Sequence, residues 1–456
     1  MRDELRILSP TAILGYGFPL RSFQNGMARK PHVIAVDAGS TDPGPYYLGS
    51  GESFTDRGAV KRDLEIMIPA AKNAGIPVII GSAGGAGGKS HVDLTLEIIK
   101  EIVREQQLTT LKVAVINSEL SQAFLLSEWE AQKIEPLAPA KPLMKETLME
   151  SCRVVAQMGE APFIEALNNG VDLILAGRAY DPSVFACLAV KEGFDKGLAL
   201  HLGKILECAA IAALPGSGSD SMLGTLREDH FEVEPLSDHR ICTILSVAAH
   251  TLYEKSDPYH LPGPGGELDL TACEFTQVSD RKVRVSGTKF VPTESYSVKL
   301  EGAKKVGCRT ISIAGVSDPI MIAKIDEILE GVKERVIDNF QGSHFGKFTL
   351  NFNVYGKNGV SLLPESTVLA TPDELAIVIE AVAETQEEAN TICSFARSTA
   401  LHFGYEGRIA TAGNLAFPFS PSDAKMGEVY EFSIYHLLEV ESESALFPVQ
   451  YLELKE

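Results

Sequence analysis

Short apolar runs alternate with helical patterns from the N-terminus to residue 215. One helical pattern places Val92, Ile99 and Ile102 on a single face, with charged residues between them. An alternation of strand and helix favours a mainly parallel sheet covered by helices, so we predict an α/β fold class for this part. The runs that predict strands are Thr11–Leu14, His32–Val36, Pro77–Ile80, Lys112–Ile116 and Val171–Leu175.

After residue 281 the pattern changes to strands that follow one another closely. A helix is expected over 318–340, and Thr385 with Glu388 forms a capping box before another helix. This pattern predicts a second domain of the α+β class. The expected strands are 282–290, 295–302, 310–315, 348–356 and 375–383.

Two stretches rich in Gly, Ser and Pro, 213–225 and 260–266, fall between these halves. Such stretches mark loops and boundaries. We therefore expect an α/β domain with a glycine-rich anion-binding loop over 1–215, a linker and loop region over 216–280, and an α+β domain over 281–456.

The residues that follow each predicted N-terminal strand are polar or rich in glycine. In an open α/β sheet, ligands bind beyond the carboxyl ends of the strands, because loops and helix N-termini converge there. We expect the five strand ends to meet in one pocket. They carry Gly15-Tyr16-Gly17, Asp37 to Asp42, residues 81–90, Asn117-Ser118-Glu119 and Gly177 to Asp181.

The stretch GSAGGAGGKS at 81–90 lies close to the nucleotide-binding pattern of Gly, four residues and Gly-Lys-Ser. Ala83 stands where the first glycine of that pattern belongs, and no strand after the loop ends in a carboxylate that would hold Mg²⁺. We interpret the loop as an anion cradle and keep a nucleotide-dependent enzyme as an alternative. The ligand-binding residues expected here are Gly81, Ser82, Gly84, Gly85, Gly87, Gly88 and Lys89.

The segment VDAGST at 36–41 resembles the phosphate loop of actin-like and sugar-kinase folds, which favours a kinase-like alternative. Two prolines follow it at once, and proline cannot continue a hydrogen-bonded hairpin. We expect Ser40 and Thr41 to contact the ligand and name Asp37 as a candidate general base.

Arg178 follows a predicted buried strand, where a guanidinium either grips an anionic substrate or pairs with a structural carboxylate. Asp181 is the other candidate base, although Asp followed by Pro182 also makes a helix start. His201 shares a helical face with Lys204, which makes it a third catalytic candidate beside a purely structural role.

The composition indicates which partners and which cellular compartment to expect. The 456 residues hold 41 Lys and Arg against 61 Asp and Glu, a net charge of −20, so we expect no nucleic-acid or membrane partner. An anionic substrate would need a local cationic pocket. Seven scattered cysteines without a C-x-x-C pair indicate a reduced compartment, and we expect a cytoplasmic protein. No metal-ligand spacing and no cofactor motif are present.

Long stretches of the chain resemble the acyclic terpene utilisation (AtuA-like) family. The resemblance is carried by GSAGGAGG (81–88), AGRAYDPSVFA (176–186), HLGKILECAA (201–210), MLGTLREDHFEVEP (222–235), SVAAHTLYEKSDPY (246–259), GPGGELDL (263–270) and HFGYEGRIATAGNLAFPFSPSD (402–423). It implies a bacterial protein linked to catabolism of terpenoids or branched acids through acyl-CoA intermediates. It implies no catalytic residue set. Longer relatives carry an extra small domain, which we expect here as a separate partner polypeptide.

The sequence therefore predicts an enzyme acting on a small anionic substrate or a CoA ester, of the lyase or hydratase type. Two alternatives stay open: a nucleotide-dependent enzyme, and a non-catalytic partner subunit of an acyl-CoA-metabolising complex. The sequence also leaves open whether the chain forms a homo-oligomer.

Overall fold

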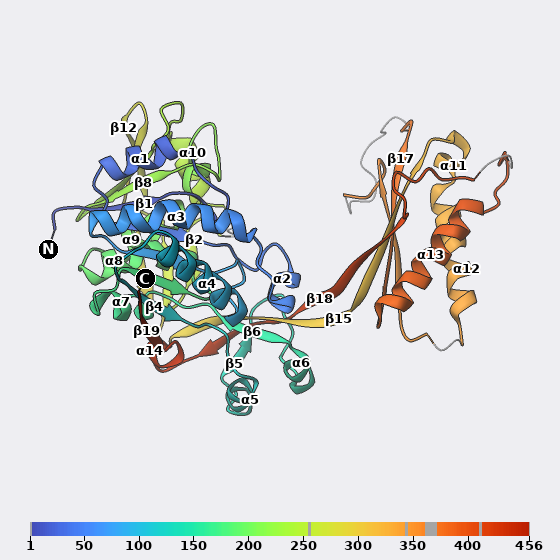
Figure 1. The fold of residues 1–456 in the computed structure, drawn as a ribbon, viewed down its shortest axis with the longest axis horizontal. Coiled ribbons are helices and arrows are strands. Elements are labelled where there is room, and N and C mark those ends of the chain that lie inside the picture. The colour runs from blue at the N-terminus through green and yellow to red at the C-terminus, as the bar shows by residue number, and fades with distance from the viewer. Residues whose placement is uncertain (1, 254–256, 343–344, 361–371, 410–412, 456) are drawn as a thin grey trace. The chain divides into compact units, whose positions relative to one another are not determined.

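The computed structural model describes residues 2–455 apart from 254–256, 343–344, 361–371 and 410–412. The chain divides into two units (Figure 1). The first unit comprises Met1–Lys304 with Phe432–Glu456, and the second comprises Lys305–Glu431. Two long strands, β15 (Ser297–Val316) and β18 (Asp423–Glu439), contribute residues to both units.

The first unit has a βα order over most of its length. Its N-terminal elements are β1 (Leu5–Ser9), α1 (Leu20–Ala28), β2 (Val33–Asp37), α2 (Pro45–Ser50), α3 (Arg57–Ala74), β3 (Val78–Gly81), α4 (Lys89–Glu105), β4 (Leu111–Ile116), α5 (Gln122–Glu130), β5 (Ile134–Pro136), α6 (Lys145–Glu150), β6 (Arg153–Ala156), α7 (Ala161–Asn168), β7 (Leu173–Ala176), α8 (Asp181–Lys191), α9 (Lys196–Leu206) and the 3₁₀ helix η1 (Ala209–Ala212). They are followed by β8 (Met222–Leu226), β9 (His230–Pro235), α10 (Ile244–Thr251), β10 (His260–Gly263), β11 (Gly266–Asp269), β12 (Glu274–Ser279), β13 (Lys282–Ser286) and β14 (Lys289–Pro292), and near the C-terminus by α14 (Glu443–Leu446) and β19 (Val449–Leu454).

A ten-stranded sheet forms the centre of this unit, in the order β12-β13-β9-β8-β1-β2-β3-β7-β4-β19. The five strands from β1 to β4 in this order are parallel. β8 pairs antiparallel with β1 on one side, and β19 pairs antiparallel with β4 on the other. The carboxyl ends of β2, β3, β7 and β4 therefore lie next to one another at one edge.

Helices cover both faces of the sheet because its buried strands are apolar on both sides. On one face α3 and α4 pack against alternate strand residues such as Ile34 and Ile80. On the other face α8 and α9 pack against the intervening residues such as Ala35 and Ile79. The result is a three-layer α/β arrangement.

The second unit is an antiparallel layer with two main helices. It contains α11 (Pro319–Ala323), α12 (Ile325–Phe340), β16 (Thr349–Tyr355), β17 (Leu375–Ala383) and α13 (Gln386–His402). β17 pairs with β16 and with Cys308–Val316 of β15. One face of β17 is buried against α12 and α13. The side chain of Thr385 caps α13 as the capping box predicts.

The predicted fold class is confirmed: the chain is mixed α/β, with a mainly parallel core in its large sheet and further antiparallel strands. Several local predictions differ from the structure. The expected strand 282–290 is two strands, β13 and β14, and the expected strands 295–302 and 310–315 are one strand, β15. The first strand is Leu5–Ser9 rather than Thr11–Leu14, since Pro10 ends the strand and 11–14 form a loop. The region 216–280, expected as a linker, supplies β8, β9 and β12 to the large sheet. Its glycines and prolines mark turns between strands.

Gly87 shows why the loop after β3 needs glycine. Its φ is +69°, and a Cβ atom there would lie 2.1 Å from the backbone nitrogen of Arg178. The loop after β3 and the segment after β7 are therefore in direct backbone contact.

We predict that Gly87→Ala lowers the free energy of unfolding by more than about 2 kcal/mol, because a positive φ and a backbone clash act together. Urea unfolding measures the change. Gly170→Ala is the matched control, since Gly170 has a φ of +64° and no heavy atom near the added Cβ. Equal losses for the two variants would show that the clash with Arg178 contributes nothing.

Candidate functional site

The ends of β3, β7 and β4 are joined by hydrogen bonds through Ser118. Its hydroxyl donates to the carbonyl of Gly87 (2.8 Å) and accepts from the backbone N–H of Arg178 (2.6 Å). The backbone N–H of Ala38, after β2, donates to the carbonyl of Gly81 at 3.0 Å. The structure thus places four of the five predicted strand ends beside one another. The fifth cluster, Gly15-Tyr16-Gly17, follows a loop rather than a strand.

The Arg178 side chain is 3% exposed and is held by two carboxylates. Its Nε donates to Glu301 Oε2 at 2.6 Å, and one Nη donates to Asp181 Oδ1 at 3.0 Å. Burial by itself lowers the pKa of Arg178, but Glu301 and Asp181 outweigh burial and raise it above its ordinary value. The guanidinium is therefore paired with carboxylates of the chain. Of the two roles that the sequence left open for Arg178, this is the structural one.

Glu301 lies on β15 and is 2% exposed. Besides Arg178, its carboxylate accepts a hydrogen bond from Thr41 Oγ1 (3.0 Å) and pairs with Lys299 Nζ (2.8 Å). Burial alone would raise the pKa of Glu301, but Arg178 and Lys299 lower it to about 2. Sequence reasoning missed Glu301 and Lys299. Their alternation with Val298 and Leu300 puts Lys299 and Glu301 on one face of the strand, but the same pattern is typical of a half-exposed strand, so it did not mark them as buried.

Asp37, at the end of β2, is also buried, but its carboxyl group has different partners from that of Glu301. Its Oδ2 accepts from the backbone N–H of Gly39 at 2.9 Å, while its Oδ1 has no hydrogen-bond partner among the described residues. Burial and the Asp181 carboxylate raise its pKa well above the ordinary value, and they outweigh Arg178 and the Gly39 N–H. Asp37 therefore holds a proton more firmly than a solvated carboxyl does.

A cavity of about 660 Å³ opens next to this cluster. Lys204 reaches it from α9 and forms an ion pair with Glu207. Burial lowers the pKa of Lys204, but Glu207 outweighs burial and raises it above its ordinary value. Lys204 therefore stays protonated in the cavity wall. The lining residues are Asp42, Leu137, Ala138, Gln157, Arg178, Tyr180, Asp181, Pro182, Lys204, Glu207, Asp257, His260, Pro262, Lys299 and Tyr435.

Several N–H groups of the glycine loop donate to protein acceptors. Ser82 and Ala83 donate to carbonyls at the end of β7, and Gly85 and Gly87 donate within the loop. At the start of α4 the Glu119 carboxylate accepts from the Lys89 N–H at 2.7 Å. A side chain of the protein thus occupies the position that a phosphate takes in a nucleotide loop.

The remaining loop residues also pack within the protein. The Lys89 ammonium is exposed and pairs with Asp93. A Cβ on Gly81, Gly84 or Gly85 would lie 2.3 to 2.9 Å from a neighbouring side chain. The imidazole of His91 accepts a hydrogen bond from the backbone N–H of Gly88 at 3.0 Å. Close packing by itself accounts for these glycines.

The structure places His201 in the core rather than beside the cavity. It is 0% exposed, and its two ring nitrogens lie 2.7 Å from Thr288 Oγ1 and 3.0 Å from Thr251 Oγ1. Burial lowers its pKa to about 3, so the ring is neutral. Ser40 also stays off the cavity and donates to Asp42 Oδ2 at 2.7 Å.

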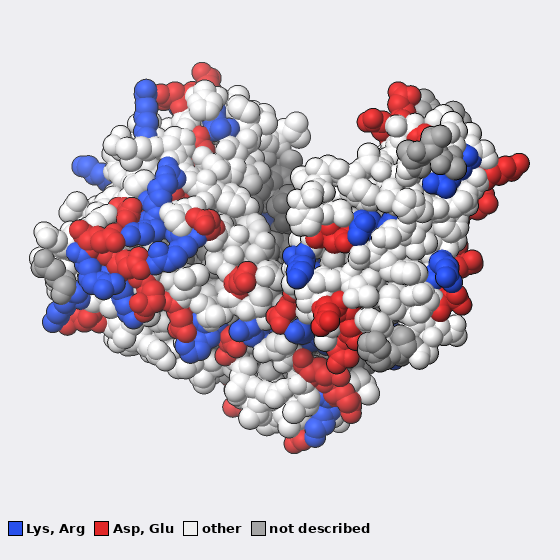
Figure 2. Space-filling view, turned by 45° about the vertical axis from the view of Figure 1, so that its right-hand side comes forward, with Lys and Arg blue, Asp and Glu red and all other residues white. Residues whose placement is uncertain are grey.

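The described residues can also be compared with the arrangements that metal ions and membranes require. Among them, no three His, Cys, Asp or Glu side chains are arranged to hold a metal ion. No helix in the same residues is long and apolar enough to cross a membrane. On the face drawn in Figure 2, acidic and basic side chains are interspersed.

A scan against protein-family models matches the acyclic terpene utilisation family, over residues 55–215 and 234–417. The chain belongs to this family. The two matched segments include the glycine loop, Arg178, Asp181 and Lys204, so the cavity lies mainly within the family region. The searches of curated proteins and of solved structures gave no match.

We predict that Arg178→Met lowers the free energy of unfolding by about 3–5 kcal/mol, because it removes the guanidinium from the buried Glu301 carboxylate, which keeps only part of its compensation through Lys299. Adding Glu301→Gln should recover part of that loss, which chemical denaturation of both variants measures. Arg21→Met is the control: Arg21 forms an exposed ion pair with Asp238, and its loss should cost less than about 1 kcal/mol. If Arg178→Met lowered the free energy of unfolding no more than Arg21→Met does, Arg178 would not form a stabilising buried ion pair.

We also predict that Asp37→Asn changes how stability depends on pH. The pKa of Asp37 is raised in the folded chain, so the free energy of unfolding falls as pH rises from the unfolded-state pKa near 4 through the folded-state pKa. Asparagine cannot ionise, so the variant should gain stability relative to the parent as pH rises. Urea unfolding from pH 5 to 9 measures this, with the exposed Asp93→Asn as control. A constant difference across that range would refute the raised pKa.

Proposed function

We propose that this chain is an enzyme that binds an organic acid or its CoA thioester in the charged cavity and transfers a proton there, as a lyase or hydratase does. The observation that carries the proposal is a set of buried charged side chains around a cavity at the carboxyl ends of parallel strands. Membership of the acyclic terpene utilisation family supports a role in terpenoid or branched-acid catabolism.

Charged side chains in the cavity wall support a functional role for the cavity, although Arg178 itself is paired with Glu301 and Asp181. Arg178 is 3% exposed and Lys204 is 4% exposed, and both line the cavity. Apolar residues of similar size often replace buried ion pairs without loss of stability. Charged groups with altered pKa values in a cavity are typical of active sites.

The chemistry needs one group that takes a proton and another that gives one. In the elimination of water from a 3-hydroxyacyl compound, a base removes the proton next to the carbonyl carbon. The carbon–carbon double bond forms, the carbon–oxygen bond breaks, and an acid protonates the departing hydroxide to give water. We assign the base to Asp181, which faces the cavity, and the acid to Lys204. The Asp181 carboxylate in turn helps to raise the pKa of the buried Asp37.

Ligand binding tests the first half of the proposal. Saturating ligand at about 100 times its Kd should stabilise the folded chain by about 2.7 kcal/mol. Thermal unfolding with short carboxylic acids, 3-hydroxy acids and their CoA thioesters measures this, with Mg-ATP as the comparison ligand. We expect stabilisation by an acid or thioester and none by Mg-ATP, since the loop donors named above are engaged. Stabilisation by Mg-ATP alone would favour the nucleotide-dependent alternative.

We predict that the bound acid or thioester exchanges its α-hydrogen with deuterium from D₂O, and that Asp181→Asn slows this exchange by about 10²-fold or more. Mass spectrometry of the recovered ligand measures the exchange without knowledge of the full reaction. Asp93→Asn, an exposed carboxylate outside the cavity, should exchange at the parent rate. Exchange at the parent rate in Asp181→Asn would remove that residue from the mechanism. Absence of binding by every acid and thioester would overturn the proposed function and favour a partner subunit.

A further inference from the structure

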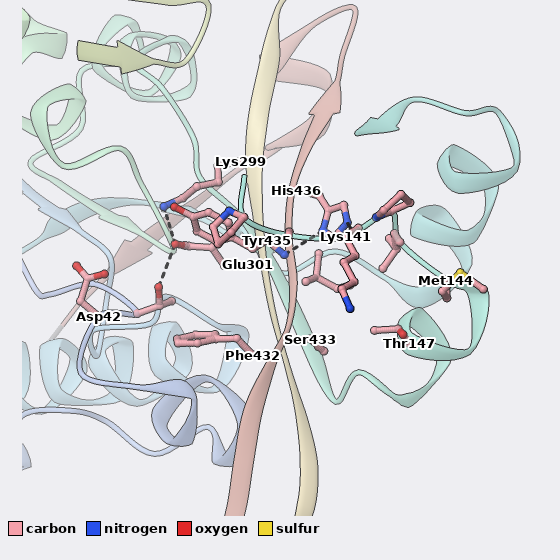
Figure 3. Close-up of a pocket in the computed structure, with 16 residues that line it drawn as sticks. Asp42, Lys141, Met144, Thr147, Lys299, Glu301, Phe432, Ser433, Tyr435 and His436 are labelled. Carbon is pink, nitrogen blue, oxygen red and sulfur yellow. Dashed lines mark hydrogen bonds and ion pairs between the residues drawn. The ribbon is translucent and has the colours of Figure 1, made fainter. Parts of the chain in front are cut away.

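A second cavity, of about 580 Å³, shares part of its wall with the charged cavity (Figure 3). Asp42, Lys299 and Tyr435 line both. Figure 3 places Asp42 and Lys299 toward one end of the second cavity, and Met144 and Thr147 toward the other. The two cavities therefore adjoin at a charged boundary.

Beyond this boundary the second cavity is lined largely by apolar side chains. Leu143 and Met144 come from the segment after β5, while Phe432 and Ile434 come from β18. Met144 is 60% exposed and Phe432 is 47% exposed. Large apolar side chains that face water around a concavity are typical of a binding surface for an apolar group.

The two walls are held together by hydrogen bonds that involve backbone groups. The backbone N–H of Leu137 donates to the carbonyl of Tyr435 at 3.2 Å, and Nε2 of the buried His436 lies 3.0 Å from the carbonyl of Lys141. Nδ1 of His436 accepts the Tyr435 N–H, so Nε2 is the donor. The cavity is thus formed in advance of any ligand.

At the boundary, the ammonium group of Lys299 contacts a carboxylate and an aromatic ring. Its ammonium lies 2.8 Å from Glu301 Oε1 and 5.2 Å from the centre of the Tyr435 ring. A polar group has ionic partners on the charged side of Lys299. The far side combines the apolar contacts with the polar side chains of Lys141 and Thr147. One ligand spanning both cavities would need a polar head and an apolar tail.

We propose that the second cavity binds the hydrocarbon chain of the substrate whose reacting head occupies the charged cavity. This inference rests on the proposed function and names its substrate class: acids or thioesters whose acyl chain runs several carbons beyond the reacting end. Leu143, Met144, Phe432 and Ile434 are then the residues that determine chain length. Each methylene buried there adds affinity through the hydrophobic effect.

The test measures the Kd of straight-chain carboxylates from two to ten carbons, and of their CoA thioesters, with the full chain by calorimetry. Affinity should rise by about twofold to fourfold per methylene until the cavity is filled. Met144→Ser and Phe432→Ser should weaken binding of the eight-carbon ligand by about tenfold and leave the two-carbon ligand unchanged. Both side chains are partly exposed, so these variants are expected to fold. Met149→Ser is the control, since Met149 is 50% exposed and does not line the cavity.

The outcomes separate the two proposals. Binding of the short acids with affinity independent of chain length would overturn the tail cavity and leave the proposed function intact. A chain-length dependence that Met144→Ser and Phe432→Ser leave unchanged would also overturn the tail cavity. Binding of no acid or thioester at any length would overturn the proposed function and this inference with it. A chain-length dependence removed by those two variants, but not by Met149→Ser, supports the assignment.

Discussion

The buried ion pair between Arg178 and Glu301 connects parts of the chain that are 123 residues apart. Arg178 follows β7 in the parallel sheet, and Glu301 lies on β15, which pairs with β6 at that point. A guanidinium this deeply buried needs carboxylate partners, since an unpaired buried charge is severely destabilising. Together with the β6 ladder, this contact fixes the part of β15 that carries Lys299 beside the sheet.

The same contact also sets the charge in the wall of the cavity. Arg178 faces two carboxylates and Lys204 faces Glu207, so these cations are already compensated by the protein. Arg178 and Lys204 thus add paired rather than isolated charges to the wall of the cavity.

Two buried carboxyl groups near Arg178 differ because their partners differ. Glu301 receives a guanidinium, an ammonium and a hydroxyl, and its pKa falls to about 2. Asp37 receives one backbone N–H and faces the Asp181 carboxylate, and its pKa rises. Burial acts in the same direction on both, so hydrogen bonds and neighbouring charges determine the sign. Adjacent carboxyls with separated pKa values are a recurring feature of acid–base sites.

The sequence by itself determined the α/β class, the strands expected at 32–36 and 77–80, each of which differs from the structure by one residue at either end, and the helices with apolar faces, because these depend on local periodicity. It also placed Arg178 and Asp181 at the sheet edge. Only the tertiary structure decided that Arg178 is paired, that Glu119 occupies the start of α4 and that His201 is a neutral core residue. Each of these depends on a partner far away in the chain. For the same reason the glycines of residues 81–88 proved ambiguous, since close backbone packing and ligand binding both require a residue without a side chain.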